Sequence, residues 1–307
     1  MRKKCLIWGS GEDYQKLYNL IKYEELKGNI SIVAIVSKDF DGRMYDGYRV
    51  ISLAEISTNI EFDYIIVASS KYYYDILIDA EKLLGNIREK IVDGKVMNIP
   101  GFDFGDYIKL RENPVSIITN DCFGGILYHY LNLEFSSPFI NCWIGADDFL
   151  QLVNDLREYM KQPLLLKYEG DMYQCPVGTL TYLQNEICIH FNHSYSFDEA
   201  KRDFERRRNR INWDNIFICS NFSNRAYTEN FAKLPYRKKN ITAEDFGIEG
   251  SIALLGYEYE YNDRQKDVSQ TREFWNYMHN MNNFTKEIDI FRMLLGKNEI
   301  KRNYYSK

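Results

Sequence analysis

The stretch "IWGSGEDYQKLYNLI" (residues 7–21) joins an apolar strand to a helix through a glycine turn. In the turn Gly9-Ser10-Gly11, Gly9 and Gly11 correspond to the first two of the three glycines of the dinucleotide-binding fingerprint. In that motif the second glycine lets a phosphate approach the backbone, and the third lets the helix pack closely on the strand. Tyr14 occupies the third position and is expected to push the helix outward. The stretch therefore predicts a first βα unit with an incomplete dinucleotide site.

A second requirement of a dinucleotide site is an acid at the end of the second strand, where it binds the ribose. This chain has Ser37 and Lys38 there, and Asp39 is displaced by two positions. Glu12 also places a negative charge where a phosphate would lie. A turn without ligand is favoured, a nucleotide or nucleotide sugar comes next, and NAD(P) is disfavoured as a cofactor.

Outward from this turn, residues 1–110 alternate strand-like and helix-like segments. The run "ISIVAIVS" (30–37) is nearly all apolar and rich in β-branched residues, as expected of a parallel strand buried on both faces. Alternation of this kind predicts a doubly wound, Rossmann-like parallel sheet. The predicted strands are 4–9, 30–37, 62–70 and 88–94, and the predicted helices are 13–26 and 72–84. Residues 48–56 are predicted to form a short strand followed by a helix capped by Ser52.

A second α/β domain is expected over 111–307, after a packed connector rich in Gly and Pro at 98–114. It combines strands and helices into a mixed sheet with helices and ends in a helical tail. A two-residue hairpin turn is expected at Gln184 and Asn185. The predicted strands are 115–120, 138–144, 163–168, 177–183, 186–193, 215–220 and 251–257, and the predicted helices are 121–131, 146–160, 196–211, a short one after Thr228, 270–281 and 284–295.

Bulk properties exclude several classes of protein. The formal net charge of the 307 residues is −5, so nothing favours a nucleic-acid partner. The longest apolar runs fall far short of the roughly 18 residues of a membrane span, and the N-terminal run is too short for a secretory signal. We therefore expect a cytoplasmic protein and leave its oligomeric state open. The six cysteines are scattered without a C-x-x-C pair, so no metal site is predicted.

The segment "SIITNDCFGG" (116–125) is the sharpest chemical feature. Ligands of α/β sheets gather at the carboxyl ends of strands, where Asn120 and Asp121 are expected to bind substrate or act as a base. Cys122 follows at a helix N-terminus, which lowers the pKa of a thiol and makes it a candidate nucleophile. The alternative is a small buried residue in a turn. Two further candidate ligand-binding residues are Gly124 and Gly125.

Two histidines and two arginines complete the candidate site. His190 and His193 precede a capped helix, and His193, at the end of its strand, is the better candidate for moving a proton. A satisfied structural histidine is the competing interpretation. Arg207 and Arg210 end the next helix and are candidates for a phosphate contact. Their competing interpretation is a solvated helix end, where cations are favoured.

Two resemblances bear on function. The order "IWG-x-G", "VAIVS-x-D", "G-Y-x-V-I-S" and "DYIIVAS" over residues 1–100 resembles the N-terminal domains of bacterial sugar-modifying enzymes. Residues 114–245 resemble a bacterial family of unknown function often labelled exopolysaccharide biosynthesis protein. The matching pieces are "TNDCFGG", "SPFIN", "DDFLQLVNDLREYM", "YQCPVG", "EICIHFNHSYSFDEAKRDFERRRNRIN" and "TEN". The family pattern usually reads Asn-Asn-Cys-Trp-Gly-Gly, whereas this chain has Asp121 and Phe123.

The resemblances imply an enzyme of surface-polysaccharide biosynthesis, a glycosyl- or group-transferase with a nucleotide-linked donor. We expect its small-molecule nucleotide or sugar substrate between the domains, near residues 9–12, 120–125 and 190–193. One alternative is a non-catalytic module that senses a nucleotide or binds a partner. Another is an NAD(P)-dependent sugar oxidoreductase, disfavoured by Tyr14 and Ser37.

Overall fold

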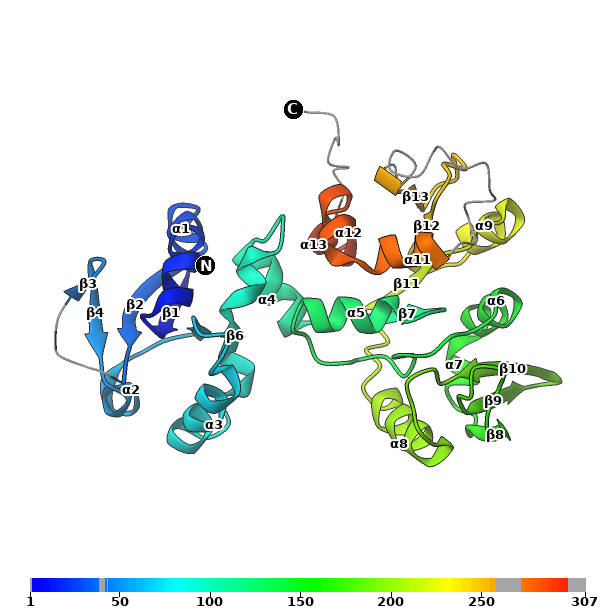
Figure 1. The fold of residues 1–307 in the computed structure, drawn as a ribbon, viewed down its shortest axis with the longest axis horizontal. Coiled ribbons are helices and arrows are strands. Elements are labelled where there is room, and N and C mark those ends of the chain that lie inside the picture. The colour runs from blue at the N-terminus through cyan, green and yellow to red at the C-terminus, as the bar shows by residue number, and fades with distance from the viewer. Residues whose placement is uncertain (1, 39–41, 43, 255, 258–271, 298–307) are drawn as a thin grey trace. The chain divides into compact units, whose positions relative to one another are not determined.

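The computed structural model describes residues 2–38, 42, 44–254, 256–257 and 272–297. Its contacts divide the chain into two compact units, Met1–Glu112 and Asn113–Lys307. Each unit contains helices and at least one parallel sheet, which confirms the predicted α/β fold class (Figure 1). Within the described residues, no helix is both long enough and apolar enough to cross a bilayer.

The first unit is built on a six-stranded sheet of order β3-β4-β2-β1-β5-β6. All neighbours are parallel except the β3–β4 pair, so the strand order reverses between β1 and β5 as in a doubly wound sheet. Its helices are α1 (Glu12–Leu26), α2 (Leu53–Asn59), α3 (Tyr73–Leu84) and α4 (Phe104–Glu112), with 3-10 turns η1 (Arg88–Lys90) and η2 (Gly94–Asn98). Its strands are β1 (Lys3–Trp8), β2 (Ile30–Val36), β3 (Met44–Tyr45), β4 (Tyr48–Ile51), β5 (Tyr64–Val67) and β6 (Ile91–Asp93).

The second unit contains two separate sheets. A four-stranded sheet of order β13-β12-β11-β7 is parallel throughout, and a three-stranded sheet of order β10-β9-β8 is antiparallel. The parallel sheet consists of β7 (Ser116–Thr119), β11 (Ile216–Ser220), β12 (Arg237–Thr242) and β13 (Ser251–Ala253). The antiparallel sheet consists of β8 (Leu165–Tyr168), β9 (Val177–Tyr182) and β10 (Asn185–His190).

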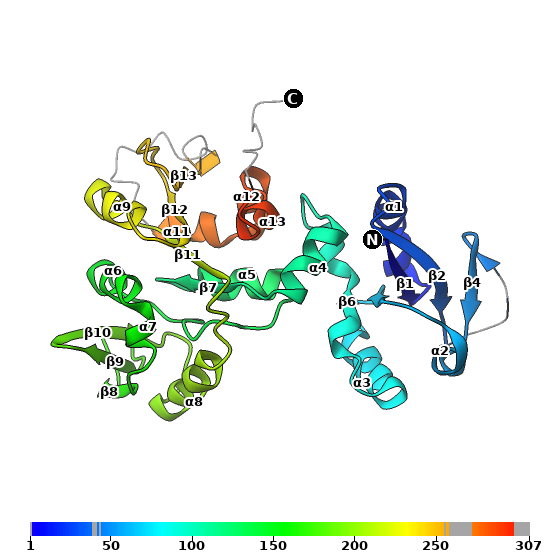
Figure 2. The same ribbon diagram turned by 180° about the vertical axis from the view of Figure 1, so that it is seen from behind.

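Helices of the second unit connect and cover these sheets. Helix α6 contacts β10 and α7 contacts β9, and both views of the ribbon show this pairing (Figures 1 and 2). One buried apolar cluster joins both sheets, since it includes Ile118 and Ile218 of the parallel sheet and Leu180 of the antiparallel sheet. The helices are α5 (Phe123–Tyr130), α6 (Ala146–Asn154), α7 (Leu156–Tyr159), α8 (Phe197–Arg208), α9 (Arg225–Ala232), α11 (Arg272–His279), α12 (Met281–Glu287) and α13 (Ile290–Leu294).

Three local predictions were wrong. Residues 138–144 form no named strand, and only Trp143 makes an isolated antiparallel bridge, to His190. Strand β12 was missed because its sequence "RKKNIT" begins with three cations, although it pairs on both sides. The hairpin turn is Leu183 and Gln184, one residue earlier than predicted, because Tyr182 pairs with Asn185. Leu183 has a positive φ of 56°, a backbone conformation that is rare for leucine, so the residue type did not indicate a turn here.

Candidate functional site

The carboxyl edge of the parallel sheet in the second unit gathers polar side chains from separate parts of the chain. Asn120 and Asp121 follow β7, and Asn221 follows the neighbouring strand β11. Asn120 and Asp121 are each only 6% exposed, which is rare for polar side chains and requires hydrogen-bond partners. The backbone supports this position, because the Asn120 carbonyl accepts a hydrogen bond from Ile144 N at 2.9 Å.

A chain of hydrogen bonds fixes how these amides point. Asn221 Nδ2 donates to Asp121 Oδ2 at 3.0 Å, and Asn120 Nδ2 donates to Asn221 Oδ1 at 2.8 Å. An ionised carboxylate only accepts, so Asp121 sets the orientation of Asn221, which in turn sets that of Asn120. The buried Asn120 Oδ1 is left without a hydrogen-bond partner among the described residues. Because that oxygen is buried, a donor group on a ligand reaches it only if neighbouring side chains move.

His279, the last residue of α11, completes the cluster. Its Nε2 lies 3.1 Å from Asp121 Oδ2, and its side chain is 24% exposed. The ring lies nearly parallel to that of Phe123, at 15° between planes and 6.1 Å between centroids. Because Asp121 accepts from Nε2–H, a neutral His279 carries its basic lone pair on Nδ1. We call Asn120, Asp121, Asn221 and His279 the edge cluster.

Two buried features hold the edge cluster in place. Asp121 Oδ1 accepts from Phe123 N at 2.9 Å, at the N-terminus of α5, where a negative charge is favoured. The loop that carries Asn221 is held by Asn240, which is fully buried and hydrogen-bonds on both sides of its amide. Its Oδ1 accepts from Ser220 Oγ and Phe222 N, and its Nδ2 donates to the carbonyl of Phe222 and to the hydroxyl of Thr228.

Gly124 and Gly125 serve packing in this structure. A Cβ at Gly124 would lie 2.9 Å from Thr119 Oγ1, which already accepts from Gly124 N and donates to the Asp121 carbonyl. A Cβ at Gly125 would lie 3.0 Å from Asn141 Oδ1. Both glycines are buried, and these close approaches account for their presence without a ligand.

The prediction of a lowered thiol pKa at Cys122 is reversed by its surroundings. Burial raises the pKa of Cys122 to about 11, and the negative charge of Asp121 adds to the effect. Cys122 is the N-cap residue of α5, but the helix field does not overcome these two influences. The residue is therefore a neutral thiol at physiological pH, which disfavours its predicted role as a nucleophile.

His190 belongs to a second polar cluster, in which Asp171 and Cys175 lie on the loop between β8 and β9. Its Nδ1 lies 2.6 Å from Asp171 Oδ2, and one ligand-type atom from each of the three residues lies within 4.8 Å of the other two. Burial raises the pKa of Asp171, but hydrogen bonds from His190, Cys175 and the backbone outweigh it and hold the pKa at about 2. Burial and the neighbouring Asp171 raise the pKa of Cys175 to about 11.

The remaining predicted residues of the second unit lie apart from the edge cluster. His193 is exposed, and its side chain makes no hydrogen bond or ion pair with any described residue. Arg207 donates to Asp203 at 2.8 Å and stacks on Phe135. Arg210 pairs with Glu134 at 2.8 Å.

The position of Arg210 argues against a role with Asp121. The residue lies between the end of α8 and the start of β11, and the nearby Asn212 N donates to Ser116 Oγ at the start of β7. This is the amino edge of the parallel sheet, opposite the edge that holds Asp121. Arg210 is therefore not brought into the edge cluster, whereas a phosphate contact by Arg207 stays a prediction.

The glycine turn of the first unit distinguishes its two glycines. Gly9 has a φ of +114°, and a Cβ there would lie 2.9 Å from the Ala68 carbonyl oxygen, whereas Gly11 has open space around it. Ser10 between them is partly buried. The Asp13 carboxylate accepts from Ser70 N at 2.7 Å and thus joins the start of α1 to the loop after β5. A carboxylate here competes with the phosphate of a dinucleotide, which supports a turn without ligand.

Tyr14, which was expected to push α1 outward, is fully buried. Its ring contacts Tyr18 and Tyr45 at centroid distances of 6.1 and 5.6 Å. Asp39, the acid displaced from the expected ribose-binding position, lies outside the described residues.

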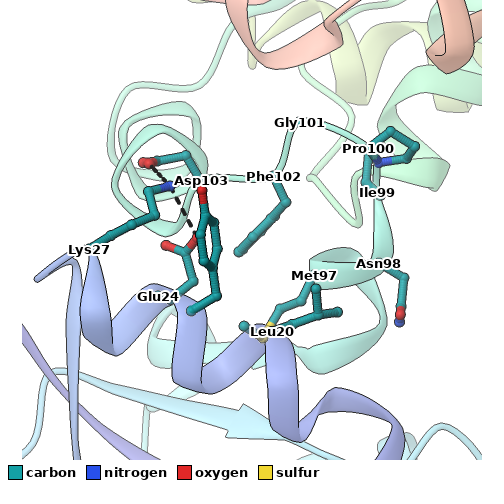
Figure 3. A pocket seen from close by; sticks show the side chains of 11 residues that line it. Leu20, Glu24, Lys27, Met97, Asn98, Ile99, Pro100, Gly101, Phe102 and Asp103 are labelled. Atoms are coloured by element: carbon teal, nitrogen blue, oxygen red, sulfur yellow. Dashed lines mark hydrogen bonds and ion pairs between the residues drawn. The ribbon is translucent and has the colours of Figure 1, made fainter. Parts of the chain in front are cut away.

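A hollow of about 460 Å³ lies in the first unit between α1 and residues 97–103 (Figure 3). Its charged groups are already paired with one another or with backbone groups. Glu24 pairs with Lys27 at 3.2 Å and accepts from Phe104 N at 2.9 Å, and Lys27 also pairs with Asp103. With these groups satisfied internally, the hollow is a packing seam and a weaker candidate than the edge cluster.

Sequence reasoning missed His279, Asn221, Asp171 and Cys175. Asn221 carried a signal, since it follows the apolar strand "NIFICS" just as Asn120 follows "VSIIT". His279 carried none, because it ends a helix 158 positions from Asp121. Asp171 and Cys175 lie in "GDMYQCPVG", whose spacing matches no metal motif.

Two different family models match successive parts of the chain. Residues 93–294 match a family model described as a domain of unknown function, DUF1919, and the chain belongs to this family. Residues 1–92 match a model described as C2185-like, N-terminal. An uncharacterized protein of Haemophilus influenzae is 30% identical over 175 residues, which cover 55% of this chain and 80% of that protein. The family boundary falls before η2, so η2 and α4 match DUF1919 although they pack in the first unit.

Proposed function

We propose that this protein is an enzyme that transfers a glycosyl or related group from a nucleotide-linked donor to a sugar hydroxyl, in surface-polysaccharide biosynthesis. The observation that carries the proposal is the Asp121–His279 contact of 3.1 Å beside the unpartnered Asn120 Oδ1. A carboxylate that orients a partly exposed imidazole is the arrangement that general acid–base catalysis requires.

The chemistry follows from the hydrogen-bond directions. Asp121 accepts from Nε2–H of His279 and stabilises the imidazolium that forms when Nδ1 takes a proton. In the proposed reaction, that proton comes from the acceptor hydroxyl, whose oxygen forms the new bond to the transferred group while the bond to the nucleotide breaks. Asn120 Oδ1 accepts a hydrogen bond from a neighbouring sugar hydroxyl. The nucleotide leaves as its phosphate anion, and His279 returns the proton to solvent.

The polysaccharide setting rests on the resemblance of residues 114–245, and the donor class on the sugar-linked N-terminal domains that residues 1–100 resemble. The NAD(P) oxidoreductase is the weakest alternative, because the Asp13 carboxylate sits at the start of α1, where a negative charge repels a dinucleotide phosphate. A binding module without chemistry would use the same edge cluster to hold a polyol. Only catalysis needs His279 to exchange a proton, so this residue separates the two.

The first test is a thermal-shift panel of nucleotide sugars, nucleoside phosphates, coenzyme A and NAD(P), with and without Mg²⁺ or Mn²⁺. A ligand at about 100 times its dissociation constant adds about 2.7 kcal/mol to the free energy of unfolding. The donor that binds is then supplied with mixed sugar acceptors, and release of the free nucleotide is followed for the wild type, His279→Gln and the exposed control His193→Gln.

We expect His279→Gln to retain donor binding and to lose turnover by about 10²–10⁴-fold, while His193→Gln stays at the wild-type rate. Turnover that survives His279→Gln would refute the catalytic role. Binding of a sugar without any turnover by the wild type would instead favour the binding module. A shift with NAD(P) alone would revive the oxidoreductase.

A further inference from the structure

The loop between β8 and β9 brings together three side chains of metal-ligating type. Asp171 and Cys175 come from this loop, and His190 ends β10 on the same antiparallel sheet. One ligand atom from each lies within 4.8 Å of the other two, the only such trio among the described residues. All three are largely buried, since Cys175 is 4% exposed and the side chains of Asp171 and His190 are 10% and 21% exposed.

Hydrogen bonds with the backbone hold two of the three residues. Asp171 Oδ1 accepts from Tyr173 N at 2.7 Å and Cys175 N at 3.3 Å, which leaves Oδ2 turned to His190. The main chain of His190 pairs with Trp143 through two hydrogen bonds, and the two rings lie 4.7 Å apart. Two of the three side chains, Asp171 and His190, are therefore held by hydrogen bonds in the absence of a ligand, as a preorganised site requires.

We propose that Asp171, Cys175 and His190 bind a zinc ion. Carboxylate, thiolate and imidazole are all ligands of Zn²⁺, and the sulfur disfavours Mg²⁺ and Ca²⁺, which take oxygen ligands. Three protein ligands leave the fourth tetrahedral position open for water or a substrate oxygen, the pattern of catalytic rather than structural zinc sites. The inference is independent of the proposed function.

Metal entry requires the imidazole and carboxylate ligand atoms to move apart. Two ligand atoms of a tetrahedral zinc ion are separated by about 3.4 Å, given metal–ligand distances near 2.1 Å. His190 Nδ1 and Asp171 Oδ2 are 2.6 Å apart, so they separate by somewhat less than 1 Å. The imidazole proton moves to Nε2, and the Cys175 thiol proton, which now points to Asn192 Oδ1 at 3.5 Å, is released to solvent as the Zn–S bond forms.

The competing explanation is a purely structural clamp, in which the His190–Asp171 contact closes the loop. A clamp needs no sulfur and no metal. The chain offers matched controls for both ligands, because Cys188 lies on β10 without belonging to the trio, and His193 lies three residues beyond His190 on the surface.

The test uses the full chain, stripped of metal with a chelator and titrated with Zn²⁺ against a chromophoric competitor. We expect about one zinc per chain, and an affinity at least 10-fold lower in Asp171→Asn, Cys175→Ser and His190→Ala. Cys188→Ser and His193→Ala should bind as the wild type does. Co²⁺ added to the wild type should give a thiolate-to-cobalt charge-transfer band that Cys188→Ser retains and Cys175→Ser loses.

Wild-type protein that binds neither Zn²⁺ nor Co²⁺ above the level of an unrelated control protein would overturn the proposal in favour of the clamp. Binding that survives Cys175→Ser would also overturn it. The Co²⁺ band of the wild type requires no variant, so the proposal is decided even if a substitution prevents folding.

Discussion

His279 Nε2 lies 3.1 Å from Asp121 Oδ2, although 158 positions separate the two residues in the chain. Asp121 is buried at the end of β7, and His279 is the last residue of α11. The carboxylate also accepts from Asn221 Nδ2 and Phe123 N, so every neighbour it has here is a donor. Its negative charge is therefore what organises the edge cluster.

Replacement of Asp121 by Asn tests this directly. The amide keeps the shape of the side chain, but one of its two terminal groups is an NH₂ group instead of an acceptor oxygen. Whichever way the amide is turned, at least one donor that now bonds to Asp121 loses its acceptor. We expect Asp121→Asn to lower the free energy of unfolding by about 1–3 kcal/mol. Urea denaturation measures the change. His279→Gln changes a partly exposed side chain, so it should lower the free energy of unfolding by less than Asp121→Asn does. Equal losses would contradict the central role of the carboxylate.

The buried amide of Asn240 should contribute more to stability than the partly exposed amide of Asn221. Four hydrogen bonds join it to the loop after β11 and to α9. Asn240→Ala leaves several buried groups unsatisfied, so we expect a loss of more than about 2 kcal/mol in the free energy of unfolding. Asn221→Ala removes a partly exposed amide and should cost about 1 kcal/mol. Denaturant unfolding of both variants decides the order, and the reverse order would show that Asn240 does not hold the loop.

The two glycines of the first turn should respond differently to alanine. Gly9→Ala combines a φ of +114° with a Cβ placed 2.9 Å from a backbone carbonyl, so it should lower Tm clearly and cost more than about 1 kcal/mol. Gly11→Ala has open space and a negative φ, so its Tm should stay near that of the wild type. If a phosphate lay against Gly11, the same alanine would abolish nucleotide binding, which the ligand panel would register.

Cys122 should be a slow thiol. A shift of its pKa from 9.0 to about 11 lowers the thiolate fraction at neutral pH about 100-fold. Iodoacetamide labelling of the native protein, read at each cysteine by mass spectrometry, should therefore leave Cys122 nearly unmodified when the urea-unfolded chain is fully labelled. Labelling of native Cys122 at the unfolded rate would restore it as a candidate nucleophile.

The parts of the fold that sequence could predict are those with one dominant local signal. The β-branched run at 30–37 contains strand β2, whose last three residues (Ala34, Ile35 and Val36) are buried on both faces, although Val33 is exposed. The run at 138–144 carries a similar apolar signature but is buried without pairing along its length. Strand β12 begins with Arg237, Lys238 and Lys239, whose backbones pair in the sheet while their side chains stay partly exposed. An apolar, buried segment is therefore not always a strand, and a strand is not always an apolar segment.

For the site, sequence could place Asn120 and Asp121 at the carboxyl edge because topology puts strand ends there. It could not supply His279, since the contact between the end of α11 and Asp121 depends on tertiary packing alone. The same limit applies to Asp171, Cys175 and His190, which meet only because the β8–β9 loop folds back on β10. Arg210 was grouped with Asp121 by sequence, whereas the direction of α8 carries it to the opposite edge of the sheet.

The first unit predicts a specific pH dependence through Glu25. Burial raises the pKa of this carboxyl, but hydrogen bonds from Tyr48, from Ile32 N and from Lys22 outweigh it, and the net pKa is lowered from 4.5. A folded-state pKa below the unfolded value means that the contribution of Glu25 to stability is fully present above pH 4.5. It is lost as the pH falls below that value and the carboxylate is protonated.

Glu25→Gln should therefore remove part of the acid sensitivity. We expect the wild type to be more stable than Glu25→Gln at neutral pH and the difference to shrink steadily below pH 4.5, as measured by urea unfolding across the acid range. Glu12→Gln is the matched control, because Glu12 lies on the same helix and, among the described residues, forms an exposed ion pair with Lys16. A constant difference between wild type and Glu25→Gln at all pH values would mean that the Glu25 contacts stabilise the fold by packing and not by charge.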